Sequence, residues 1–155
     1  MMSAIEAKLA ELGLTLPAAP AAGGNYVPHR INGNTLILSG VISMRDGIVT
    51  HAGQVGAGIQ TIDTGRAAAQ VCALNVLAAI KAALGDLDRV KEFLYVGGYV
   101  NAVAGFDSSP QVINGASDLF VKLYGDAGKH ARAAVAVAGL PKNATVEIQV
   151  TVSFE

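Results

Sequence analysis

Residues 64–84 constrain the fold of this 155-residue chain more than any other segment. They have the length and composition of a helix, they are apolar on nearly all sides, and Gly85 is a typical helix end. A helix of this kind must be covered on several sides rather than along one stripe. Gln70, Asn75 and Lys81 interrupt the apolar run, so we interpret it as a core helix and expect no membrane span.

Two more helices and a set of strands are predicted around this core helix. Ser3 and Glu6 form a capping box that begins a short helix. This helix lies within an N-terminal extension of the domain over residues 1–16. A further helix begins at Ser109 as N-cap with Pro110 in its first turn, and it ends at Gly125. Its apolar stripe comprises Val112, Ala116, Leu119, Phe120 and Leu123. Strands are predicted over residues 35–39, 48–51, 90–100, 131–138 and 145–154.

This order of elements predicts an α+β fold, with two helices packed on one face of a mostly antiparallel or mixed sheet and a short N-terminal helix added. A length of 155 residues is typical of one domain, so we expect residues 1–155 to fold as a single unit.

The two C-terminal strands carry the most informative charges. In residues 146–154 the odd positions are polar and the even ones apolar, which places Glu147 on the face away from the core. In residues 131–138 we expect Val135 and Val137 to point into the core, which places Arg132 with small alanines on the other face. A guanidinium suits bidentate binding of a carboxylate. A structural ion pair or a surface arginine is the alternative that the pattern leaves open.

Composition limits the classes of function. Only 15% of the residues are charged and 52% are hydrophobic, which favours a subunit that hides apolar surface against its copies. A net charge of −1 without a basic cluster argues against nucleic-acid binding. Cys72 is the only cysteine, and no histidine has the spacing of a metal site, so we expect no metal. No signal peptide is visible, and we expect a cytoplasmic protein.

Four segments together resemble one family. Residues 132–149 read RAAVAVAGLPKNATVEIQ and resemble the C-terminal signature of the RidA (YjgF) family, which has an Arg, an apolar strand, Leu-Pro and a strand with a Glu. Residues 20–26 (PAAGGNY) resemble the Pro-rich start of that family, which ends in a Tyr, and residues 33–40 (GNTLILSG) resemble its strand with the pattern Gly-Asn…Ser-Gly. Asn114 falls where the family has an Asn inside its second helix. The likeness covers roughly residues 17–155.

The resemblance implies a chorismate-mutase-like fold, a homotrimer with clefts between subunits, and cofactor-free hydrolysis of reactive enamine and imine acids such as 2-aminoacrylate. Carried over to this sequence, Arg132 would bind the substrate carboxylate and Glu147 would position the attacking water. The pocket would be lined by Tyr26, Ser39, Gly40 and Asn114.

The sequence departs from the family pattern in ways that concern the substrate. Ala134 stands where the family often has a Cys, and residues 41–43 read Val-Ile-Ser in place of the usual Gln-Ile-Pro. These features indicate a divergent subgroup. A trimer that binds small carboxylates without catalysis is an alternative, because Arg132 would serve it equally. An endoribonuclease, a label sometimes attached to this family, is disfavoured by the charge and the absence of Trp.

Overall fold

The computed structural model describes residues 2–155, and its centre is the long helix α2 (Ile62–Leu84). The hydroxyl of Thr61 caps the helix by accepting a hydrogen bond from the backbone N–H of Thr64, and Gly85 ends it in a left-handed conformation with φ 84°. The helix therefore begins two residues earlier than predicted. It is long and apolar enough to cross a membrane, but 67% of its most apolar 18-residue stretch is buried inside the fold, as in a core helix.

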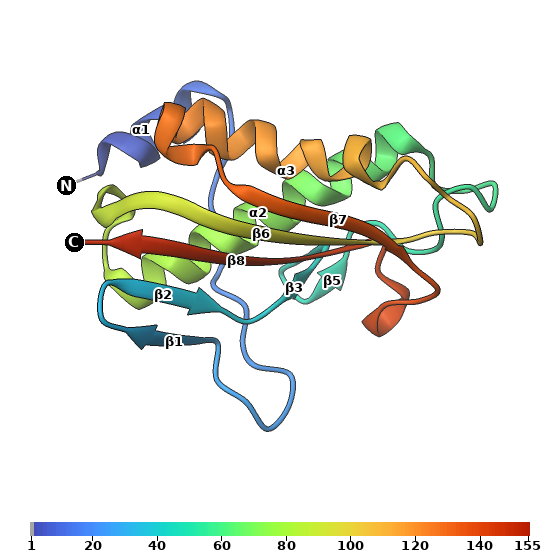
Figure 1. Ribbon diagram of the computed structural model, residues 1–155, viewed down its shortest axis with the longest axis horizontal. Coiled ribbons are helices and arrows are strands. Elements are labelled where there is room, and N and C mark those ends of the chain that lie inside the picture. Colours follow the sequence, from blue (N-terminus) through green and yellow to red (C-terminus); the bar gives the residue numbers. More distant parts are fainter. Residues whose placement is uncertain (1) are drawn as a thin grey trace.

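A mixed sheet lies on one side of α2 (Figure 1). Its strand order is β1-β2-β8-β6-β7, and β3 also pairs with β8. Strands β6 and β7 are parallel because α3 crosses between them, whereas the other pairs are antiparallel. The strands are β1 (His29–Asn32), β2 (Thr35–Leu38), β3 (Val41–Ile42), β6 (Val90–Asn101), β7 (Ala131–Val137) and β8 (Val146–Phe154), beside the small hairpin of β4 (Met44–Arg45) and β5 (Ile48–Val49).

Helix α3 (Ser109–Tyr124) lies beside α2 on the same face of the sheet, and α1 (Ala4–Glu11) packs at their end (Figure 1). The predicted apolar stripe of α3 is buried throughout, which confirms it. The N-cap position is held by Ser108 rather than Ser109, although the side chain of Ser108 makes no capping hydrogen bond, and Pro110 lies in the first turn as expected. Short 3-10 turns occur at Leu87–Arg89, Gly125–Gly128 and Pro141–Asn143. The architecture is the predicted α+β fold, with the short N-terminal helix added.

The two core helices approach each other closely at Gly115. A Cβ atom on this residue would lie 2.1 Å from the backbone oxygen of Arg66 in α2. Contact at this distance excludes every residue with a side chain unless the helices separate. The sequence therefore sets the spacing of α2 and α3 at this position, and α3 carries two side chains of the candidate site.

The alternation predicted for β8 is confirmed. Val146, Ile148, Val150 and Val152 are fully buried against the helices, while Glu147 is half-buried on the opposite, open face of the sheet. Each residue of β6 lies on the same face of the sheet as the β8 residue with which it pairs. Val96 therefore shares the core face with Val150, and Tyr99 shares the open face with Glu147.

The orientation predicted for β7 is wrong. Arg132 pairs with Val96 and so lies on the helix-covered face, whereas Val135 pairs with Tyr99 and is 47% exposed on the open face. The prediction placed the larger apolar side chain inside. Strand β7 is an edge strand, however, and its inner face meets the polar side of α3, where small Ala134 packs against the core and Arg132 finds hydrogen-bond partners.

Candidate active site

Four polar side chains meet between β7 and α3, and we call them the arginine cluster: Arg132, Asn114, Ser117 and His130. The Nη1 atom of Arg132 donates to Asn114 Oδ1 at 2.8 Å and to Ser117 Oγ at 3.1 Å. Nη2 of Arg132 donates to the carbonyl oxygen of Pro110 at 3.3 Å. The half-buried guanidinium is thus held against the first turns of α3 by three oxygen atoms, none of which carries a charge.

The guanidinium retains donors and an unbalanced charge. Arginine has five N–H groups, and three of those of Arg132 are used, which leaves the Nε hydrogen and one Nη2 hydrogen. Within residues 2–155 three ion pairs occur, and none includes Arg132. A half-buried cation without a counter-ion is costly, and an anionic ligand at its remaining donors would offset that cost.

His130 completes the arginine cluster through two short contacts. Its Nδ1 lies 2.7 Å from the carbonyl oxygen of Gly128, and its Nε2 lies 2.8 Å from Ser117 Oγ. Burial lowers the pKa of His130, the carbonyl of Gly128 opposes this, and the charge of Arg132 adds to the lowering. His130 is therefore held in its neutral form near neutral pH.

A second set of residues, which we call the glutamate cluster, comprises Glu147, which lies on the open face, and Ser39, Gly40 and Tyr26. Glu147 pairs with Ile42 of β3, and this brings its side chain beside the turn that precedes β3. A Cβ atom on Gly40 would lie 2.8 Å from Glu147 Oε2, so the carboxylate occupies the space that a larger residue would need. Among the described residues the carboxylate has no hydrogen-bond or ion-pair partner.

Ser39 and Tyr26 are fixed by backbone contacts beside this carboxylate. Ser39 Oγ donates to the carbonyl oxygen of Val27 at 2.6 Å, and the hydroxyl of Tyr26 accepts from the backbone N–H of Gly23 at 2.9 Å. Both residues line an open groove of about 470 Å³. Together with Gly40 they also line a small hollow of about 20 Å³. Tyr26, Ser39 and Gly40 of the family-derived pocket thus line one hollow, and Glu147 lies against Gly40 without lining that hollow.

Arg132 and Asn114 do not join them in one chain. The strand register places Arg132 on the helix-covered face and Glu147 on the open face of the same sheet. The expectation that both point away from the core, toward one cleft near Ser39 and Gly40, is therefore wrong for a single chain. The chain instead carries two separate groups of polar residues, one cationic and one anionic, and neither has a charged partner among the described residues.

Burial raises the pKa of Glu147. The folded state consequently binds this proton more tightly than the unfolded chain does, so ionised Glu147 lowers stability above its folded pKa and has no such effect below its unfolded pKa. We expect Glu147→Gln to melt at a higher temperature than the wild type at pH 7, with the difference shrinking as the pH falls to about 4. Thermal denaturation across this range tests the sign. Glu92→Gln, at an exposed position of β6, controls for the lost charge. A pH-independent difference would contradict the prediction.

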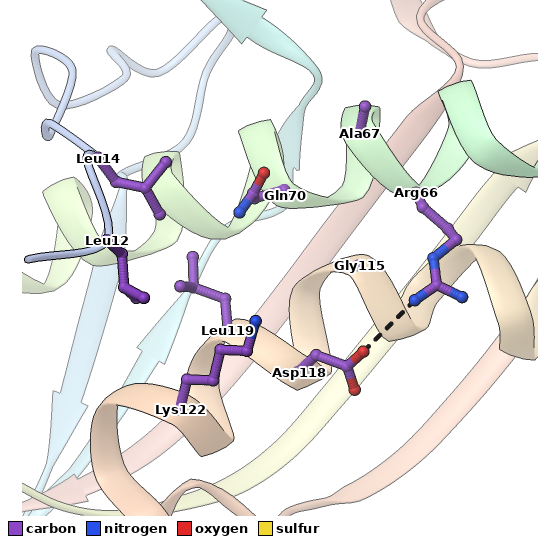
Figure 2. Close-up of a pocket in the computed structure, with 9 residues that line it drawn as sticks. All are labelled: Leu12, Leu14, Arg66, Ala67, Gln70, Gly115, Asp118, Leu119 and Lys122. Carbon is purple, nitrogen blue, oxygen red and sulfur yellow. Dashed lines mark ion pairs between the residues drawn. The ribbon is translucent and has the colours of Figure 1, made fainter.

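A different hollow, of about 300 Å³, opens on the helical side of the molecule (Figure 2). It lies between Leu12 and Leu14, which follow α1, and the facing surfaces of α2 and α3, where Arg66 and Asp118 form an ion pair at 3.5 Å. None of the site residues predicted from the sequence lines it. The described residues contain no group of three metal-binding side chains, and Cys72 is fully buried in α2.

Ser117 and His130 were missed at the sequence level. His130 immediately precedes β7. Two spacings could have found them: His130 is two residues before Arg132, on the same side of an extended chain, and Ser117 is one helical turn after Asn114.

Comparison with known proteins identifies the family. A model of the family described as "YjgF/chorismate mutase-like, putative endoribonuclease" matches residues 6–152. The chain is 44% identical over 151 residues to protein TCP17 of Trypanosoma cruzi, covering 97% of this chain and 94% of that protein. The chain belongs to the YjgF/chorismate mutase-like family, and its α+β fold is the fold of that family.

Two solved structures place the chain within the family. It superposes on the protein Atu1372 of Agrobacterium tumefaciens, whose function is unknown, with a TM-score of 0.91 and 44% identity, covering 98% of this chain and 93% of that one. For RidA from an Antarctic Psychrobacter species the TM-score is 0.60 and the identity 28%, covering 88% and 94% of the two chains. The fold therefore matches Atu1372 much more closely than RidA, in line with the departures seen in the sequence.

Proposed function

We propose that the protein hydrolyses small reactive enamine and imine acids of the 2-aminoacrylate type to 2-oxo acids and ammonia, without a cofactor. The observation that carries this proposal is the guanidinium of Arg132, which is half-buried, has no counter-ion in the part of the chain that the structure describes, and keeps two N–H donors for a ligand. Membership of a family that includes RidA supports the choice of reaction.

Arg132 selects the kind of ligand. Two N–H donors on one planar group match the two oxygens of a carboxylate, and a single uncompensated positive charge matches a monoanion. The neighbouring side chains Asn114 and Ser117 are neutral, and Lys129 is already paired with Asp126 at 3.0 Å. Small 2-imino and 2-oxo monocarboxylates satisfy these conditions, whereas a dianion would bring an excess of negative charge.

Glu147 is the proposed proton-transfer group. In the reaction the oxygen of a water molecule bonds to the imine carbon, and the carboxylate of Glu147 accepts a proton from that water. That proton passes to nitrogen, which gives a tetrahedral carbinolamine. Glu147 then transfers the proton of the new hydroxyl to the same nitrogen, the C–N bond breaks, ammonia leaves and the carbonyl forms. The raised pKa of Glu147 suits a group that must both take and return a proton. Imine hydrolysis is intrinsically easy, so positioning and this proton transfer suffice.

The two groups would meet between copies of the chain. Because Arg132 and Glu147 of one chain lie on opposite faces, the cleft that the reaction needs would combine the arginine cluster of one copy with the glutamate cluster of the next. The open face offers a contact surface of small and apolar residues, among them Ile37 and Tyr95, which are 43% and 37% exposed. A cyclic homotrimer with one cleft between each pair of neighbours fits this arrangement.

Mixing two inactive variants tests both the reaction and the shared cleft. Arg132→Ala and Glu147→Gln are each expected to lose most of their activity as homotrimers when an amino-acid oxidase generates the imine in the assay. Co-expressed in equal amounts, they should form trimers in which about a quarter of the clefts have both residues intact, so about a quarter of the wild-type rate returns. A rate of zero in mixed trimers confirmed by native mass spectrometry would place both residues in one chain and refute the shared cleft.

The same assay separates the enzyme from a trimer that only binds carboxylates. The enzyme releases ammonia faster than the uncatalysed reaction, and Glu147→Gln keeps pyruvate binding while losing the rate, because only proton transfer is removed. A wild type that binds pyruvate by calorimetry without accelerating ammonia release would favour the binding protein.

A further inference from the structure

A directed chain of hydrogen bonds runs from the donor Arg132 through Ser117 and His130 to the carbonyl oxygen of Gly128. A carbonyl oxygen can only accept, so His130 Nδ1 must carry the hydrogen that it shares with Gly128 at 2.7 Å. In the neutral ring Nε2 then has a lone pair and accepts from the hydroxyl of Ser117 at 2.8 Å. With its hydrogen committed to His130, the Ser117 oxygen presents lone pairs to Arg132.

The opposite direction is disfavoured at each step. A hydrogen on Nε2 alone would leave the lone pair of Nδ1 facing the carbonyl oxygen of Gly128 at 2.7 Å, which is repulsive. A doubly protonated ring would place a second positive charge beside Arg132, and burial together with that charge lowers the pKa of His130. The ring itself is held by Phe120, which is fully buried and meets it edge-on at 6.1 Å and 82°.

We propose that His130 and Ser117 are positioning residues that lock the guanidinium of Arg132 through Nη1, so that its Nε and remaining Nη2 hydrogens face the ligand carboxylate. Without these contacts the guanidinium could rotate, and the N–H groups that face the ligand would exchange with those bound to α3. This lock holds the two free N–H groups of Arg132 in the parallel arrangement that bidentate binding of a carboxylate requires. The identity of the ligand rests on the proposed function, whereas the lock itself does not.

Pyruvate binding by calorimetry is the first test. We expect Ser117→Ala to weaken binding by about tenfold, because a hydrogen bond to a charged group is lost and the fork becomes mobile. Ser117→Thr keeps the hydroxyl and should recover most of the affinity. His130→Phe keeps the edge contact with Phe120 but removes the acceptor, and should weaken binding as Ser117→Ala does. Ser108→Ala is the matched control, since the hydroxyl of Ser108 hydrogen-bonds to Asp107 and, within residues 2–155, to no member of the arginine cluster.

Nuclear magnetic resonance of the free protein is the second test and needs no ligand. We expect His130 to show the tautomer with hydrogen on Nδ1, and the Nη signals of Arg132 to be resolved in the wild type and in Ser117→Thr. In Ser117→Ala and His130→Phe they should merge through faster rotation.

The two tests separate failure of the lock from failure of the proposed function. A wild type that binds pyruvate no more tightly than Ser117→Ala overturns the positioning role and leaves the deaminase proposal intact. A wild type that binds no pyruvate overturns the proposed function. The nuclear magnetic resonance signals of the Arg132 Nη groups then test by themselves whether His130 and Ser117 fix the guanidinium. Equal Nη signals in the wild type and Ser117→Ala would overturn it.

Discussion

Replacing Arg132 with alanine should lower the affinity for pyruvate, and the deamination rate at low substrate, by about 30-fold or more. Removing one partner of a desolvated, hydrogen-bonded charge pair costs roughly 2–5 kcal/mol, which corresponds to a loss of this size or larger. The loss should be this large because no other uncompensated cation lies in the arginine cluster. Calorimetry with pyruvate and ammonia release with an imine generated in situ measure the two quantities.

Arg132→Lys should fail almost as completely. An ammonium keeps the charge but has no planar fork, so it cannot bind Asn114 and Ser117 and still present two parallel donors to a carboxylate. Arg66→Ala is the matched control, because Arg66 is an exposed arginine on the helical side and is paired with Asp118. Equal binding and equal rates for the wild type and Arg132→Ala, with both proteins folded, would refute the assignment of Arg132.

Gly115→Ala should destabilise the protein by about 1–3 kcal/mol, the range found when extra atoms are forced into a packed interior. Helix propensity alone predicts the opposite sign, since alanine is favoured over glycine in a helix by about 1 kcal/mol. The steric effect should win because the added Cβ would meet the backbone oxygen of Arg66 at 2.1 Å, and no side-chain rotation relieves a backbone clash.

Urea denaturation of the Gly115→Ala variant measures this effect. Gly139→Ala is the matched control, because a Cβ atom on Gly139 would have nothing within 4 Å. The variant should also bind pyruvate more weakly, since moving α3 displaces Asn114 and Ser117 from Arg132. A Gly115→Ala protein as stable as the wild type would show that α2 and α3 can separate at no cost.

Strong patterns in the sequence predicted the elements that bury much apolar surface. Strand β8 alternates between large apolar and polar side chains, so its buried face could be predicted, and all four valine and isoleucine positions lie in the core. The stripe of α3 has a similar contrast and is likewise buried. In such segments the hydrophobic effect decides the orientation, and it can be predicted from local sequence.

The orientation of β7 could not be predicted in this way. Apart from Arg132, this strand contains only alanine and two valines, so the difference in buried apolar area between the two orientations is small. Hydrogen bonds to α3, which is distant in sequence, determine the orientation instead. The same reason hid Ser117 and His130, because their role depends on contacts between two elements rather than on a pattern within one.

The separation of the arginine and glutamate clusters onto opposite faces has a genetic consequence for the proposed trimer. Each copy would contribute to two clefts, giving its arginine to one neighbour and its glutamate to the other. A copy that carries both Arg132→Ala and Glu147→Gln would therefore inactivate both of the clefts to which it contributes, although its neighbours supply intact residues to those clefts. Such an allele would be dominant-negative, whereas two alleles that each carry one of the changes would complement each other.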